Sequence, residues 1–365
     1  MSTTPPPPNP RPVPLDAEQL RRRLAEGLAI PAHPLALDAQ RRLDVRRQRA
    51  LARYYIDACA GGLAVGVHTT QFAIREVGLF EEVLRIAAAA ACERATPGRA
   101  PLVMVAGLCG RTAQAAAEAR LASSLGYHVG LLSLAALKGE GEDALIEHCQ
   151  AVAEQMPLIG FYLQPAVGGL ELSAAFWARF AAIDNVVAIK VAPFNRYRTL
   201  DVVRGVVQAR AEKRVLLYTG NDDHIVLDLL TPFTVVRDGK PVTLRFAGGL
   251  LGHWSVWTAG AVQLLERCKA AVRSGAPIST ELLALDSRVT DCNSAFFDVA
   301  NQFRGCIAGC HEVLRRQGLL EGLWCLDPNE GLSPGQADEI DRVLAQHADL
   351  SDDAFVATHL DRWLA

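Results

Sequence analysis

Eight short apolar runs recur along the chain, and segments of helical character separate most of them. The runs cover residues 28–33, 62–67, 102–107, 128–134, 158–163, 186–191, 215–220 and 244–251. The intervening segments are rich in Ala, Leu, Arg and Glu at helical spacing. A continuous apolar run is typical of a strand that is buried on both faces, and such strands form parallel sheets covered by helices. The pattern therefore predicts an α/β fold with a parallel sheet.

Two parallel architectures compete for these strands. Eight strand–helix units fit a TIM (β/α)8 barrel in number and length. A doubly wound open sheet usually has a glycine-rich turn after its first strand and an acidic residue about 20 positions later. The segment "GLCGRT" at 107–112 lacks the third glycine and that acidic residue. We therefore predict a TIM barrel with a helical extension at its C-terminal side.

The predicted organisation has three parts. Residues 1–25 contain a proline tract, "MSTTPPPPNPRPVP", and the start of a helix, which we interpret as a disordered leader. The barrel is expected over 26–275 and the helical extension over 276–365. The segment 234–244 is predicted to be a β-hairpin that turns at Asp238–Gly239, inserted before the last barrel strand.

Composition narrows the classes of partner. The chain has 365 residues and a net charge of −3, which favours neither nucleic-acid nor membrane binding. Its nine cysteines include no CxxC pair, and this is typical of reduced thiols in a cytoplasmic protein. Cys306, Cys310 and His311 are interpreted as one packed helix face, so we expect neither a metal site nor a cofactor.

One lysine stands near the end of a buried apolar run, in "NVVAIKVAP" at 185–193. The chain has only five lysines among its 37 basic residues, and this one is Lys190. An amine in an apolar barrel mouth loses hydration, which lowers its pKa, and a neutral amine can attack a carbonyl to form a Schiff base. The alternative is a lysine whose amine reaches solvent along an apolar stem.

Other polar residues follow the predicted strands at the same end, where barrel enzymes place their active sites. Tyr162 lies one strand before Lys190, and its phenol is suited to carrying protons. Thr69 and Thr70 are suited to holding a carboxylate. A core tyrosine and ordinary turn capping are the alternatives for these residues. His68, Gly220 and Gly249 complete the predicted rim.

Four segments together resemble a known family. They are "GLAVGVHTTQF", "VAGLCGRTAQAAAEARLASSLGYHVGLLS", "GFYLQPAVGG" and "NVVAIKVAP", in this order. They resemble the dihydrodipicolinate synthase / N-acetylneuraminate lyase family over residues 28 to 345. The resemblance implies a class I aldolase that uses a Schiff base on a TIM barrel with a C-terminal helical extension, and a homo-oligomer, either dimer or tetramer.

The resemblance also implies roles for individual residues. Lys190 matches the Schiff-base lysine, and Tyr162 matches the catalytic proton carrier. Thr69 and Thr70 match the pair of threonines that holds the carboxylate of a 2-oxo acid. Gly220 matches a glycine that lies near the bound substrate.

The sequence also departs from the family pattern. His68 and Gln71 replace two glycines of the threonine turn, and Phe72 replaces its acid. No arginine follows near Val167, where a synthase binds its second substrate, and the relay tyrosine after the fourth strand is missing. We therefore predict a lyase, either aldolase or dehydratase, acting on a pyruvate-like 2-oxo acid.

Two other functions stay open from the sequence. One is a family member that binds a metabolite without catalysis. The other is a metal-dependent barrel enzyme, whose ligands would be His68, Asp222, Asp223, His224 and His253.

Overall fold

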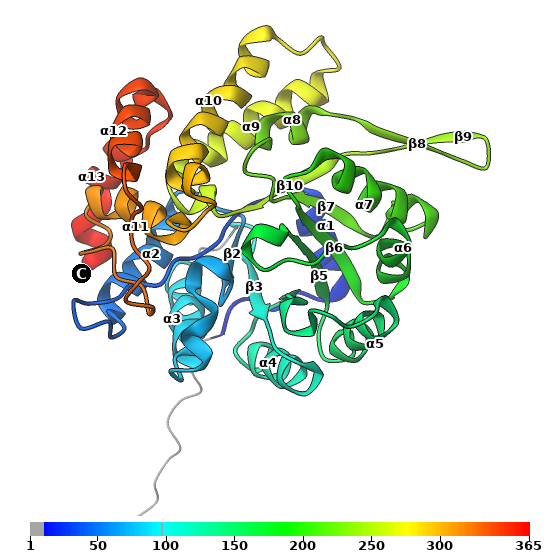
Figure 1. The fold of residues 1–365 in the computed structure, drawn as a ribbon, viewed down its shortest axis with the longest axis horizontal. Coiled ribbons are helices and arrows are strands. Elements are labelled where there is room, and N and C mark those ends of the chain that lie inside the picture. Colours follow the sequence, from blue (N-terminus) through cyan, green and yellow to red (C-terminus); the bar gives the residue numbers. More distant parts are fainter. Residues whose placement is uncertain (1–10, 96–97) are drawn as a thin grey trace, which may run out of the picture.

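Eight parallel strands form a barrel in the computed structural model, which describes residues 11–95 and 98–365 (Figure 1). The strands pair in the order β1-β10-β7-β6-β5-β4-β3-β2, and a parallel bridge between Ala32 and Ala64 joins the two ends. The predicted TIM barrel is confirmed. Its strands are β1 Ala29–Pro31, β2 Gly62–Val65, β3 Val103–Leu108, β4 Val129–Leu132, β5 Leu158–Leu163, β6 Val186–Ala192, β7 Leu216–Thr219 and β10 Phe246–Leu251.

Helices follow the strands and cover the outside of the barrel (Figure 1). Several begin at a residue whose side chain accepts a hydrogen bond from a free backbone N–H group of the first turn. Asp44, Ser173 and Asn195 cap α2, α6 and α7 in this way. The barrel helices are α2 Val45–Asp57, α3 Phe80–Glu93, α4 Thr112–Ser124, α5 Glu142–Ala153, α6 Ala174–Ala182, α7 Arg196–Gln208, α8 Ile225–Leu230 and α9 Thr258–Ser274.

A further helix closes the amino-terminal end of the barrel. This is α1, Ala17–Ala25, and its Leu20 and Leu24 are buried in the same cluster as the side chains of the barrel interior. The Tyr218 hydroxyl on β7 donates a hydrogen bond to the Leu24 carbonyl at 2.6 Å. This packing closes the end of the barrel opposite to the carboxyl ends of its strands. Residues 1–10, which hold most of the predicted proline-rich leader, lie outside the described residues.

The predicted hairpin is confirmed. Strands β8, Phe233–Arg237, and β9, Lys240–Leu244, pair antiparallel. Their turn places Asp238 and Gly239 at φ 51° and 74°, the left-handed region that two-residue hairpin turns require at both positions. The hairpin projects away from the barrel (Figure 1).

The chain after α9 forms a group of helices beside the barrel (Figure 1). Several hydrogen bonds join this group to the turn after β7; in one of them the Asn293 amide donates to the Asp222 carbonyl at 2.5 Å. No helix in the described part of the chain is long and apolar enough to span a membrane. The extension consists of α10 Thr280–Phe296, α11 Cys306–Arg316, α12 Gln336–Gln346 and α13 Asp353–Leu364.

Candidate active site

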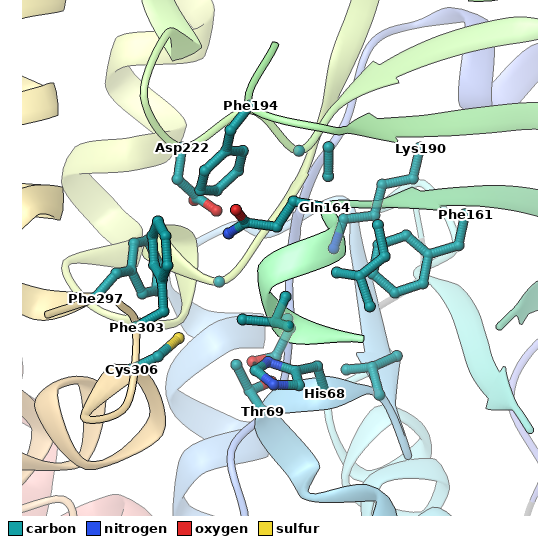
Figure 2. A pocket seen from close by; sticks show the side chains of 17 residues that line it. His68, Thr69, Phe161, Gln164, Lys190, Phe194, Asp222, Phe297, Phe303 and Cys306 are labelled. Atoms are coloured by element: carbon teal, nitrogen blue, oxygen red, sulfur yellow. Dashed lines mark hydrogen bonds between the residues drawn. The ribbon is translucent and has the colours of Figure 1, made fainter. Parts of the chain in front are cut away.

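A cavity of about 560 Å³, counting its part open to solvent, lies at the carboxyl ends of the strands. Both the barrel and the extension contribute to its wall (Figure 2). The lining residues are Ala32, Val67, His68, Thr69, Phe161, Leu163, Gln164, Val167, Lys190, Ala192, Phe194, Gly220, Asp222, Gly252, Phe297, Phe303 and Cys306.

Lys190 reaches this cavity from β6. Its side chain is 8% exposed, and its Nζ lies 4.4 Å from the centroid of the Phe161 ring on the neighbouring strand. Burial lowers the pKa of the Lys190 amine, and the negative charge of Asp222 partly opposes this effect. The amine is therefore a buried group with an increased neutral fraction, as a carbonyl-attacking nucleophile needs.

Asp222 belongs to the turn after β7 and is as buried as Lys190, with 8% exposure. Its Oδ1 accepts a hydrogen bond from the His253 backbone N–H at 3.2 Å. Burial raises the pKa of the Asp222 carboxyl, and the charge of Lys190 opposes this shift. For both Lys190 and Asp222, burial favours the uncharged form of the group. The opposite charge of the partner favours the charged form and partly offsets the effect of burial.

The absence of a side chain at Gly220 leaves room for the side chain of Lys190. A Cβ at this position would lie 2.7 Å from Lys190 Cε and 2.8 Å from Ala192 Cβ. Because Ala192 Cβ is fixed to the strand backbone, the lysine side chain would have to move. The predicted position of Gly220 at the candidate site agrees with this geometry.

We expect Gly220→Ala to slow covalent capture of pyruvate by Lys190 at least tenfold. A displacement of a reacting group by about 1 Å is enough to cost up to 10²-fold in rate. Borohydride trapping followed by intact-mass measurement tests this, with Gly141→Ala as the control, because a Cβ on Gly141 meets nothing within 4 Å and its φ is −75°. A Gly220→Ala variant that traps pyruvate at the wild-type rate would contradict the expectation.

The turn after β2 brings two of its three predicted residues to the cavity. His68 and Thr69 line it, and both belong to the short helix η1, His68–Thr70. Burial lowers the pKa of His68 to about 4, and the positive charge of Lys190 adds to this effect. His68 is therefore neutral at pH 7. The Thr69 hydroxyl donates a hydrogen bond to the Ala32 carbonyl at 2.7 Å.

The prediction that Thr70 holds a ligand is wrong for its side chain. Its hydroxyl accepts hydrogen bonds from the backbone N–H groups of Gly66 and Val67 and donates one to the His33 carbonyl at 2.6 Å. Thr70 does not line the cavity. Its hydroxyl instead folds the turn that presents His68 and Thr69.

The prediction that Tyr162 lies beside Lys190 is also wrong. Side chains alternate along a strand, and on β5 it is Phe161 that faces the lysine. Tyr162 points to the other face, where its ring packs 5.1 Å from the Trp177 ring of α6. Its hydroxyl donates a hydrogen bond to the Leu172 carbonyl at 3.3 Å. No phenol therefore lines the cavity in the described structure.

Gly249 does not line the cavity either, which corrects its predicted place at the rim. A Cβ on Gly249 would lie 2.7 Å from the ring of Trp254. The glycine therefore allows Trp254, which is fully buried, to pack against the last barrel strand.

Several lining residues were not predicted from the sequence. Phe194 comes from the loop after β6, where its position at the rim was the only available signal, whereas Gln164 follows β5 at the rim position that the sequence indicated. Three others come from the helical extension, which the sequence did not connect to the mouth of the barrel. These three are Phe297, Phe303 and Cys306.

The residues proposed as alternative metal ligands are dispersed. The described residues contain no group of three or more His, Cys, Asp or Glu side chains arranged to hold a metal ion. His224 Nδ1 pairs with Asp286 Oδ2 of α10 at 3.1 Å, and His253 is buried with its pKa lowered to about 4. Only His68 and Asp222 of the five proposed ligands line the cavity.

The closed barrel and the cavity at the carboxyl ends of its strands place this chain among the (β/α)8-barrel proteins. The profile of the dihydrodipicolinate synthetase family matches residues 28–232. Because the match spans more than half of the sequence, the chain belongs to this family. The family resemblance predicted from the four motifs is confirmed, together with the lyase fold that it implies.

Solved structures agree on the fold at low sequence identity. A dihydrodipicolinate synthase from Acinetobacter baumannii, solved with pyruvate, has 17% identity and a TM-score of 0.71, over 88% of this chain and 99% of its own. An N-acetylneuraminate lyase from Fusobacterium nucleatum has 15% identity and a TM-score of 0.68, over 88% and 99%. A putative dihydrodipicolinate synthetase from Pseudomonas aeruginosa has 18% identity and a TM-score of 0.69, over 87% and 98%. A search of curated proteins found no match.

Proposed function

We propose that this protein is a lyase that forms a Schiff base between Lys190 and the keto group of a pyruvate-like 2-oxo acid. The observation that carries the proposal is the buried amine of Lys190, whose pKa is lowered by the apolar cavity around it. The neutral amine attacks the keto carbon, and the protonated imine then withdraws electrons from the adjacent carbon. This supports cleavage of a carbon–carbon or carbon–oxygen bond without a cofactor.

The carboxylate of the 2-oxo acid is proposed to bind beside His68 and Thr69, at the turn after β2. The backbone N–H groups of Thr70 and Gln71 already donate hydrogen bonds to carbonyls within the turn. The carboxylate is therefore proposed to contact His68 and Thr69 and not these two N–H groups. Thr70 supports this site indirectly, because its hydroxyl fixes the turn.

The rest of the substrate is proposed to be apolar. Four phenylalanine rings line the cavity, whereas Lys190 is the only lysine or arginine among the lining residues of the described structure. A second carboxylate would lack a cationic partner there, and burial of an unpaired charge is costly. The lining rings are Phe161, Phe194, Phe297 and Phe303.

Incubation with pyruvate and borohydride tests this function. We expect an intact-mass increase equal to reduced pyruvate on Lys190, and no increase for Lys190→Ala. Lys213→Ala is the control, because Lys213 is outside the cavity and should leave the adduct unchanged. Failure of pyruvate and of every 2-oxo acid in a panel, including apolar substituted ones, to modify Lys190 would refute the proposal.

A second candidate is a protein that binds the 2-oxo acid without turning it over. The observation that favours it is Phe161, which faces Lys190 where the family resemblance placed a tyrosine. Catalysis requires a proton carrier other than a tyrosine, whereas binding alone requires none. Exchange of substrate C–H protons with solvent would show that such a carrier is present and would exclude a purely binding role.

A further inference from the structure

Imine chemistry at Lys190 needs a group that takes up and returns protons. Few of the cavity's polar side chains can do this. The Thr69 hydroxyl already donates to a carbonyl, and the Gln164 amide does not titrate near neutral pH. Burial keeps His68 neutral with a pKa of about 4, and it raises the pKa of the Cys306 thiol well above its usual value.

We propose that Asp222 is the catalytic proton carrier of this site, in the role for which the sequence predicted Tyr162. The role rests on the Lys190 Schiff base proposed above. Asp222 is the only carboxyl group among the residues that line the described cavity.

The fold holds Asp222 in a suitable position. Its carboxylate accepts a hydrogen bond from the His253 N–H, and its backbone carbonyl accepts one from the Asn293 side chain. These contacts anchor it from the β10 loop and from α10. Figure 2 shows the side chains of Asp222 and Lys190 pointing into the cavity from different sides. In the proposal, a substrate bound to the lysine lies within reach of Asp222.

Burial supports the same role. It raises the pKa of the Asp222 carboxyl toward neutrality, where a group both accepts and donates protons efficiently. The nearby charge of Lys190 opposes the shift and disappears when the amine becomes neutral, so the two groups titrate as a pair.

Asp222 acts first as an acid and then as a base in the proposed reaction. The neutral Lys190 nitrogen adds to the keto carbon, and one of its protons passes to the former carbonyl oxygen, which becomes a hydroxyl. Protonated Asp222 then gives a proton to this hydroxyl, which leaves as water while the nitrogen lone pair forms the C=N bond of the protonated imine. The Asp222 carboxylate then removes a proton from the adjacent carbon. The C–H electrons form a C=C bond while the C=N π electrons move to nitrogen, which gives a neutral enamine. Return of the proton to carbon reverses this last step.

Hydrogen exchange into pyruvate tests the proposal without knowledge of the natural substrate. In D₂O the wild-type protein is expected to replace the methyl protons of pyruvate with deuterium, which NMR follows directly. We expect Asp222→Asn to exchange about 10²-fold more slowly, the lower end of the usual contribution of a general acid–base group. Asp143→Asn is the control, because this carboxylate is 87% exposed and does not line the cavity.

Borohydride trapping after long incubation separates this proposal from the function on which it rests. Asp222→Asn should still reach the wild-type adduct yield, which also shows that the cavity is intact. No adduct on the wild-type protein overturns the Schiff-base function and the Asp222 role with it. A normal adduct with wild-type exchange in Asp222→Asn, or an equal loss of exchange in Asp143→Asn, overturns the Asp222 role alone.

The pH dependence of trapping gives a further readout. The titratable groups that interact with Lys190 are Asp222, His68 and Cys306, and of these only Asp222 carries a charge near neutral pH, because burial keeps His68 and Cys306 uncharged. The negative charge of Asp222 raises the pKa of Lys190, so its removal lowers that pKa. We therefore expect the rise of the trapping rate with pH to begin at a lower pH in Asp222→Asn. An unchanged profile would contradict a direct interaction between the two groups.

Discussion

Replacement of Asp228 by alanine is expected to lower the free energy of unfolding by about 3 to 5 kcal/mol. Asp228 is fully buried in α8, where its Oδ2 accepts hydrogen bonds from Thr219 Oγ1 at 2.6 Å and Asn221 Nδ2 at 2.9 Å. Its other carboxylate oxygen pairs with Arg196. The alanine variant leaves several buried donors without this acceptor, and each loss carries a desolvation cost.

The same variant is expected to slow pyruvate exchange. The Asn221 side chain accepts a hydrogen bond from the Phe194 N–H at 3.1 Å, and Phe194 lines the cavity with a left-handed φ of 48°. Loss of Asp228 frees the Asn221 amide to rotate, and the wall formed by Phe194 then loses its support. Denaturant unfolding measures the first effect, and deuterium incorporation into pyruvate measures the second.

Asp228→Asn is the matched control for this network. It keeps the size of the side chain and one acceptor oxygen but loses the charge, so we expect a smaller loss of stability than for alanine. Equal unfolding free energies for the wild-type protein and Asp228→Ala would show that the network does not stabilise the fold.

Glu118→Ala is expected to cost about 3 to 5 kcal/mol as well, because it leaves a buried arginine without its partner. Glu118 pairs with Arg75 through two contacts of 2.9 Å, and their side chains are only 9% and 10% exposed. Arg75 also donates to the Gly66 and Gly107 carbonyls, at 3.3 and 2.9 Å. The pair thereby ties the segment after the His68–Thr70 turn to β3.

Two controls define the origin of this cost. The first control is the exposed pair of Arg267 and Glu281, whose side chains are 54% and 84% exposed. Glu281→Ala is expected to lower the free energy of unfolding by only about 0 to 1 kcal/mol. The double variant Arg75→Met with Glu118→Met should recover part of the loss, because apolar replacement of a buried pair removes the unpaired charge. A double variant that is less stable than Glu118→Ala would contradict this account.

Most of the barrel was readable from the sequence. Each predicted apolar run matches one barrel strand to within two residues at either end, and the hairpin turns at the predicted Asp238–Gly239. This succeeded because a strand buried on both faces must be apolar throughout, while the helices that cover it carry a different period. Because the side chains on both faces of such a strand are apolar, the sequence does not show which face points into the barrel.

That hidden face explains the misplaced tyrosine. Phe161 and Tyr162 are adjacent and both buried, so apolar content does not distinguish the inward side chain from the outward one. Only the register of β5 against β6, which pairs Phe161 with Lys190, decides between them. A shift of one residue along a strand moves every side chain to the opposite face.

The sequence by itself determined the barrel, the family and the lysine at the mouth, because these follow from local periodicity, motif order and one unusual residue in an apolar run. The tertiary structure alone decided which groups surround that lysine. It replaced a phenol with Phe161, brought Asp222 into the cavity, and added Phe297, Phe303 and Cys306 from the helical extension. Such contacts depend on strand register and on the packing of segments about 100 residues apart, which no local pattern records.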